Sequence, residues 1–256
     1  MKRFVNTGRI SLPISFAIAL MVWEGAVYIL KTPDYLMPAP SRVFTALVES
    51  FPLLMRHGAV TMLEVISGFL SALILSAVIS LLMVRYRILY NILWPYMVIS
   101  QTVPLYVLAP LFMVWFGFGI LPKVLIVVLV CFFPITVGLV QGLTSTEPEL
   151  DELLKIMRAT QSQILWKVKV PQAMPQFFSG LKIAAAYSVT GAVLSEWVGA
   201  KEGLGIFLTR SMKTFKTAAL FADVFIIIVL SLGMFFLVTY LEKKLIKRRT
   251  DFYEES

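Results

Sequence analysis

The sequence predicts an all-α membrane protein with about six transmembrane helices and one long cytoplasmic loop. Hydrophobic residues make up 59% of the 256 residues and charged residues only 15%, whereas an ordinary soluble domain has about 25% charged residues. Apolar runs of about 20 residues recur along the chain, and this length crosses a hydrocarbon core of about 30 Å. The sequence contains no internal repeat or low-complexity linker, so residues 1–256 are predicted to form a single transmembrane domain.

Six spans are the simplest division of the chain. The predicted spans are 11–30, 59–84, 92–115, 120–143, 178–198 and 221–241. The first resembles a signal peptide, but it is long enough to cross a bilayer and no small-residue cleavage site follows it, so we expect it to be retained. Pro104 and Pro110 are expected to kink or break the third span. We also expect a surface helix near 41–55 and an interfacial helix after Gly205.

The net charge of +8 reflects membrane orientation rather than a nucleic-acid partner. Basic residues occur in short loops and at the C-terminus, between the apolar runs. If the N-terminus is inside, the inner segments hold about twice as many lysines and arginines as the outer ones, as the positive-inside rule requires. We therefore expect a multi-pass protein of the plasma or inner membrane with both termini in the cytoplasm.

The loop between the fourth and fifth spans, residues 144–176, carries the most informative pattern. A cap residue, an early proline and acidic residues at 146–152 predict a helix start. A second short helix is predicted from Ser162 to Val170, with Pro171 as its end. Apolar residues recur at helical spacing in the first helix: Leu150, Leu153, Leu154 and Met157. Two such helices fit a groove on another protein; the alternative is that they lie on lipid headgroups.

This loop resembles the Glu-Ala-Ala loop of binding-protein-dependent ABC importer permeases. Three segments fall at that family's spacing, and others resemble its motifs. The first set is Glu152-Leu153-Leu154, Arg158, and Val168 with Val170-Pro171; the second is Met37–Ser41, Gln101–Pro104, Leu111–Gly119, Glu196–Ala200 and Gly203–Gly205. The resemblance covers nearly the whole chain and is to the nitrate, taurine, aliphatic sulfonate and thiamine-precursor branch.

The resemblance implies that the loop forms coupling helices which dock on an ABC ATPase. The residues that it assigns to ATPase coupling are Glu152, Leu153, Leu154, Met157, Arg158, Val168 and Pro171. It also implies an ATPase dimer, an extracellular substrate-binding protein and a second copy of this chain as partners. Arg158 stands where the family has a glycine. Because glycine accepts a positive φ without steric cost and arginine does not, a different turn or a straighter junction is expected there.

Polar residues within the predicted spans are candidates for a substrate path. These are Glu64, Gln101, Thr102, Tyr106 and Glu196. Gln101, Thr102 and Tyr106 are chosen because the third span is expected to be broken beside them. Each carboxyl group is unusual in an apolar run, where an ionisable side chain either marks a pathway or lies near the interface.

The resemblance also suggests a substrate. Residues 61–69 and 210–217 are most similar to permeases of thiamine pyrimidine precursors. Permeases for aliphatic sulfonates, taurine or nitrate are the alternative, and they tend to carry a basic residue at the position of Glu64. An acidic residue there disfavours an anionic ligand.

Other functions fit the sequence less well. The Gly-x-x-x-x-Gly-Lys-Ser/Thr pattern is missing, so the chain is not expected to cradle ATP itself. One histidine and one cysteine leave no metal cluster or nucleophile dyad, so we expect neither an enzyme nor a cofactor or metal. An ion-coupled secondary transporter is the alternative from another class, but such proteins often contain paired repeats.

Overall fold

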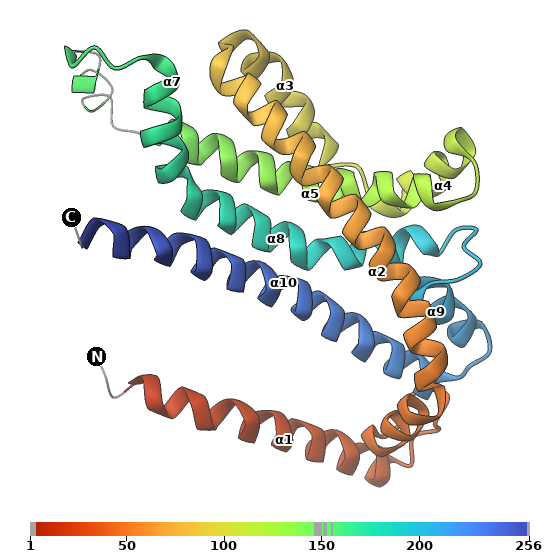
Figure 1. Cartoon of the computed structure of the whole chain (residues 1–256). Coiled ribbons are helices and arrows are strands. Elements are labelled where there is room, and N and C mark those ends of the chain that lie inside the picture. The colour runs from red at the N-terminus through yellow and green to blue at the C-terminus, as the bar shows by residue number, and fades with distance from the viewer. Residues whose placement is uncertain (1–3, 146–149, 151–152, 155, 255–256) are drawn as a thin grey trace.

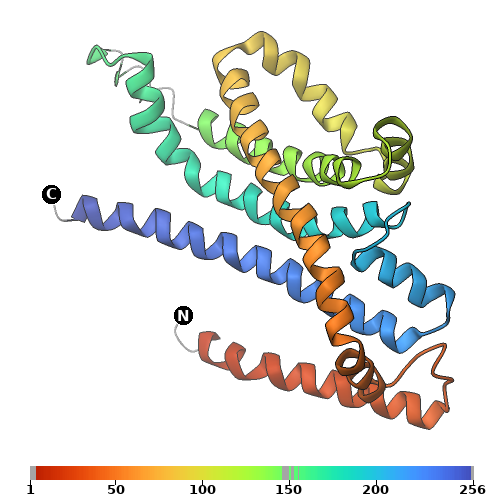
Figure 2. The same cartoon turned by 45° about the vertical axis from the view of Figure 1, so that its right-hand side comes forward.

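The fold is an array of long helices, several of which run from one end of the molecule to the other (Figure 1). The computed structural model describes residues 4–145, 150, 153–154 and 156–254, and the regular structure in these ranges is entirely helical. Figures 1 and 2 agree that the start of α1, the end of α10 and helix α7 lie at one end of the array, whereas α4 and α9 lie at the other. We call these the α7 end and the α9 end.

Several of these helices have the length and hydropathy of membrane spans. The elements are α1 (Phe4–Leu30), α2 (Pro40–Arg85), α3 (Arg87–Ser100), α4 (Leu105–Phe116), α5 (Ile120–Thr144), α7 (Gln161–Ile164), a π-helical turn (Leu165–Lys169), α8 (Val170–Glu196), α9 (Leu204–Lys213) and α10 (Thr217–Glu254). Among the described residues four helices qualify, or five if α3 and α4 form one broken span. The described apolar part of α1, Ile14–Leu30, is shorter. The all-α membrane fold is confirmed, whereas the number of six spans stays a prediction.

Helix α2 corrects the expectation of a separate surface helix near 41–55. One continuous helix runs from Pro40 to Arg85, with Pro40 in its first turn, where a missing N–H costs nothing. Pro52 lies inside this helix without ending it. Proline removes the hydrogen bond to the carbonyl of Val48, a residue that is 60% exposed, and the helix nevertheless continues to Arg85.

The predicted break of the third span is confirmed at Pro104 but not at Pro110. Helices α3 and α4 meet at an angle of 105° across residues 101–104, and Pro104 has an extended backbone (φ −62°, ψ 128°) just before α4. Pro110 lies inside α4. A proline disfavours helical geometry for the residue before it, so the turn forms where Pro104 follows Val103.

Helix α8 corrects the prediction that Pro171 ends a short helix. The helical path continues from Gln161 to Glu196, and Pro171 lies in the first turn of α8. The turn before it is π-helical, with the Val170 N–H bonded to the carbonyl of Leu165. This wider turn accommodates a proline that has no N–H to donate, so the helix is not interrupted.

Glycines let α5 and α8 pack with their backbones in direct contact. A Cβ on Gly138 would lie 2.6 Å from the carbonyl oxygen of Gln176, and one on Gly180 would overlap that of Pro134. On the other side of α5, a Cβ on Gly68 of α2 would lie 2.5 Å from Cβ of Val127. Small residues that bring helices this close are typical of packing within membranes, where hydrophobicity does not drive helices together.

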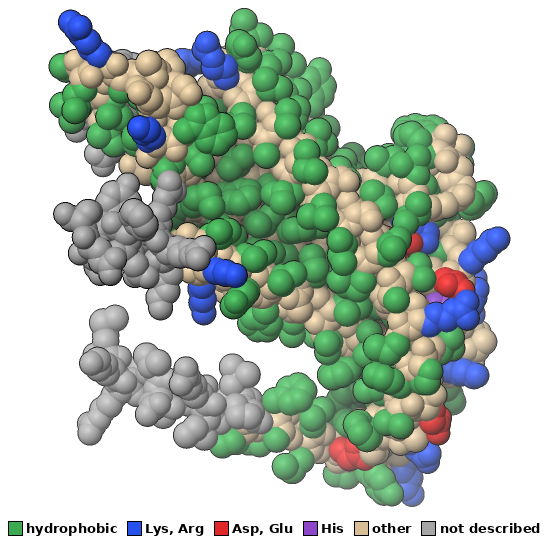
Figure 3. Space-filling view, in the orientation of Figure 1, with side chains coloured by type: hydrophobic (Ala, Val, Ile, Leu, Met, Phe, Trp, Pro, Cys, Tyr) green, Lys and Arg blue, Asp and Glu red, His purple; other side chains and the backbone are tan. Residues whose placement is uncertain are grey.

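The surface has an apolar belt between charged ends. In Figure 3 hydrophobic side chains cover most of the middle of the visible face, and lysine and arginine side chains gather toward the α7 and α9 ends. Lipid replaces water around such a belt, which explains why large apolar residues such as Ile74 (67% exposed) and Phe236 (61% exposed) lie outside the core.

Candidate functional site

At the α9 end, side chains from two long helices hold the start of α9. Three consecutive backbone N–H groups donate to them. The pairs are Gly203 to Nδ1 of His57 (2.9 Å), Leu204 to Oγ1 of Thr61 (2.9 Å) and Gly205 to Oε2 of Glu196 (2.6 Å). Thr61 in turn donates to Oε1 of Glu196 (2.7 Å). The first N–H groups of a helix lack partners within the helix, so α2 and α8 supply the cap that α9 cannot make itself.

Glycines are required at positions 203 and 205 because α8 approaches the backbone at the start of α9 too closely for a side chain there. Gly203 has φ +128°, and a Cβ there would overlap the carboxylate of Glu196. A Cβ on Gly205 would overlap the carbonyl oxygen of Val193. Both positions therefore need glycine for contact with α8, and Gly203 also needs it for its backbone conformation.

A buried ion pair lies beside this cap. Nζ of Lys123 on α5 is 2.6 Å from Oε1 of Glu64 on α2, and the side chains are 9% and 2% exposed. Oε2 of Glu64 has no hydrogen-bond partner among the described residues. Glu64 is also close enough to Glu196 for the two carboxyl groups to interact electrostatically. Lys123 is thus the compensating cation for a deeply buried acidic cluster.

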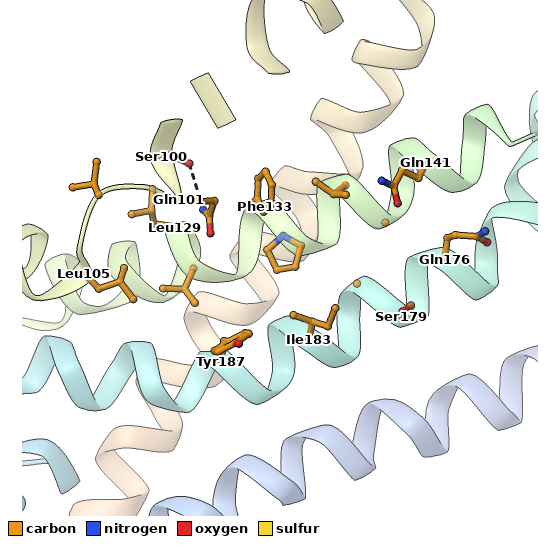
Figure 4. Close-up of a pocket in the computed structure, with 16 residues that line it drawn as sticks. Ser100, Gln101, Leu105, Leu129, Phe133, Gln141, Gln176, Ser179, Ile183 and Tyr187 are labelled. Carbon is orange, nitrogen blue, oxygen red and sulfur yellow. Dashed lines mark hydrogen bonds between the residues drawn. The ribbon is translucent and has the colours of Figure 1, made fainter. Parts of the chain in front are cut away.

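A cavity of about 550 Å³ opens between the α3–α4 break, α5 and α8 (Figure 4). Its lining residues are uncharged. They are Ser100, Gln101, Val103, Leu105, Leu129, Val130, Phe133, Pro134, Val137, Gly138, Gln141, Gln176, Ser179, Gly180, Ile183 and Tyr187. Gln101 bonds weakly to Oγ of Ser100 (3.4 Å) at the break. A volume of this size is typical of sites for small molecules.

The structure separates the residues predicted for a substrate path. Gln101 lines the cavity, whereas Thr102 and Tyr106 are not among its lining residues. Glu64 and Glu196 lie in the buried cluster at the α9 end and contact other parts of this chain. Sequence reasoning missed Gln141, Gln176, Ser179 and Tyr187. Polar residues inside apolar runs were the available signal, but no single helix shows that they share a cavity.

The predicted coupling segment lies at the α7 end, and part of it is outside the described residues. Glu152 falls in that part. Leu153 and Met157 are 53% and 71% exposed, and Leu154 is half-buried. Farther along, Val168 and Pro171 are both half-buried. Thr160 and Gln163 then form a capping box at the start of α7, which is a stable helix start.

Arg158 corrects the expectation of a changed turn. It has φ 60°, the left-handed conformation that glycine usually supplies, and Ala159 N–H donates to the carbonyl of Leu154 (3.0 Å). This six-to-one hydrogen bond around a left-handed residue is the Schellman end of a helix. The turn is therefore one that suits glycine, and arginine occupies it at a cost of about 1–2 kcal/mol.

Arg158→Gly is expected to stabilise this turn by about 0.5–1 kcal/mol, because the left-handed cost disappears and glycine's greater unfolded-state entropy offsets only part of the gain. Amide hydrogen exchange at Ala159 should then slow by about two- to fivefold. Arg158→Ala is the control, since it removes the side chain but keeps Cβ. Equal exchange in both variants would contradict strain at Arg158.

The apolar helix array is that of a multi-pass membrane protein, with an uncharged cavity between its helices. The chain belongs to the family of binding-protein-dependent transport system inner membrane components, which matches residues 68–247. It is thus an ABC transporter permease. It is 36% identical to the formylaminopyrimidine transport permease protein ThiX of Halalkalibacterium halodurans, over 91% of this chain and 94% of that protein.

Two further relatives show the range of the family. The riboflavin transport system permease protein RibX of Chloroflexus aurantiacus is 31% identical, over 93% of this chain and 90% of that protein. The taurine transport system permease protein TauC of Escherichia coli is 23% identical, over 85% of this chain and 82% of that protein. The resemblance inferred from the loop 144–176 and from motifs elsewhere in the chain is confirmed.

Proposed function

We propose that this permease is the membrane-spanning subunit of an importer that moves a thiamine pyrimidine precursor into the cytoplasm. The observation that carries the proposal is the 36% identity, over nearly the full length, to a permease named for formylaminopyrimidine transport. An importer of aliphatic sulfonates, taurine or nitrate is the second candidate, and the relative named for taurine transport supports it at 23% identity.

The energy in this proposal comes from a separate ABC ATPase dimer. It docks at the α7 end, on the segment that contains Leu153 and Met157, whose apolar side chains are exposed outside the long spans. Exposed apolar groups of this kind are suited to a groove on a partner protein. Both termini lie on the same, cytoplasmic side. Two copies of the chain form the pathway, and an external binding protein delivers the solute at the α9 end.

The proposal predicts ATP-dependent uptake of formylaminopyrimidine. Proteoliposomes containing the chain, its ATPase and the binding protein should accumulate the labelled pyrimidine only with ATP, and should accumulate labelled taurine poorly. The chain purified alone should not hydrolyse ATP, because it has no phosphate-cradling loop.

Either of two results would count against the proposal. Preferential accumulation of taurine would favour the second candidate. Uptake that needs an ion gradient and ignores ATP would place the chain among secondary transporters.

A further inference from the structure

One face of α8 carries polar side chains, although the helix has the length and hydropathy of a membrane span. Gln176, Ser179, Ile183 and Tyr187 all line the cavity, and their spacing of three or four residues places them along a single face. The twelve residues from Gln176 to Tyr187 extend about 16 Å along the helix. This length is about half the thickness of a hydrocarbon core of about 30 Å.

The adjoining wall comes from α5, which packs directly against α8. Gln141 of α5 lines the same cavity, and the backbones at Gly138 and Gly180, where the two helices touch, form part of the lining (Figure 4). Both glutamines are exposed in the isolated chain. Gln141 lies in the last turn of α5, and Gln176 lies just before the predicted span 178–198, so both amides lie on the α7 side of the cavity. Polar side chains within or beside a span line water-filled space or meet other polar groups, and this stripe faces the cavity.

None of the described residues that line this cavity is basic. Lys123 and Lys182 are the only basic residues in the sequences of α5 and α8. Lys123 is paired with Glu64, and Nζ of Lys182 is 2.9 Å from Oε2 of Glu242. Neither lysine is among the lining residues. An anion that loses water needs a compensating charge, and both of these charges are already neutralised.

We propose that this cavity is a binding site for an uncharged, planar solute of the nitrogen-heteroaromatic class during transport. Gln141 and Gln176 each offer a donor and an acceptor, which matches ring nitrogens and amino groups. Phe133 and Tyr187 offer aromatic faces for stacking. The inference rests on the proposed import function and adds the residues that select the solute.

Cysteine protection tests the site directly. The chain has one cysteine, Cys131, which is fully buried and within hydrogen-bonding distance of the carbonyl of Ala184. Ser179→Cys would therefore introduce the single accessible thiol of this chain. Assembled with its ATPase and binding protein in proteoliposomes, this variant should react with a water-soluble maleimide, because the thiolate forms only where water reaches it. Gln141→Cys probes the α5 side of the cavity if Ser179→Cys fails to assemble.

Formylaminopyrimidine at about ten times its dissociation constant should slow labelling about tenfold, because only the unoccupied fraction reacts. Taurine at the same concentration should leave the rate unchanged. Ser71→Cys is the matched control: Ser71 is exposed on α2 and is not a cavity residue. It should label slowly, and neither solute should alter its rate.

Two results would overturn the inference. Labelling of both cavity cysteines as slow as that of Ser71→Cys would mean that the stripe is not hydrated. Protection by taurine equal to that by the pyrimidine, or by neither solute, would remove the assignment of ligand class. Uptake by the unmodified complex is measured in parallel. Transport of the pyrimidine without protection refutes this inference alone, whereas loss of ATP-dependent uptake refutes the proposed function.

Discussion

Lys123→Met is expected to destabilise the folded permease by about 3–5 kcal/mol, because it leaves a buried carboxylate without its cation. Glu64 is 2% exposed, one of its oxygens already lacks a partner among the described residues, and Glu196 adds a second carboxyl group nearby. The loss should appear as a fall in the melting temperature of the purified protein on the order of 10 °C.

Two further variants separate the ion pair from simple loss of a side chain. Glu64→Leu combined with Lys123→Met should recover most of the stability, since replacing both members of a buried pair by apolar groups is often neutral. Arg42→Met removes a cation from an exposed pair with Asp34 (3.9 Å) and should cost at most about 1 kcal/mol. If the double variant melts as low as Lys123→Met, the cause is packing rather than an uncompensated charge.

Leu153→Asp is expected to release the ATPase and abolish uptake. If Leu153 is buried on docking, the contact is worth roughly 1.5–3 kcal/mol, and a charge there costs at least as much. This corresponds to a loss of tenfold or more in ATPase affinity. The chain itself should fold and insert normally, because Leu153 is 53% exposed in its structure. Co-purification of the ATPase and ATP-dependent uptake are the measurements.

Leu245→Asp is the matched control for that experiment. Leu245 has nearly the same exposure, 54%, but it lies near the end of α10 rather than in the predicted coupling segment. This variant should retain the ATPase. If Leu153→Asp also retains it and transports normally, the segment contacts lipid headgroups instead of a partner protein.

The helix boundaries show where local sequence rules succeed and where they do not. The break at Pro104 was predictable, since that proline restricts Val103 and leaves the next helix to start anew. Pro52 and Pro171 follow the same local rule, yet both lie inside continuous helical paths. Whether a proline ends a helix depends on the partner of the freed carbonyl and on turns such as the π-helical one before α8, which are properties of the folded chain.

The sequence by itself determined the membrane class and the family, because both depend on composition and on motifs with fixed spacing along the chain. Only the tertiary structure decided which polar residues act together. Glu64 on α2 and Lys123 on α5 are 59 residues apart in the sequence, and their side chains form an ion pair between these helices. Gln141 and Gln176 share a cavity because Gly138 and Gly180 let α5 and α8 approach closely. Helical periodicity indicates which residues share a face, but the partner that each face meets is set by packing between helices distant in sequence.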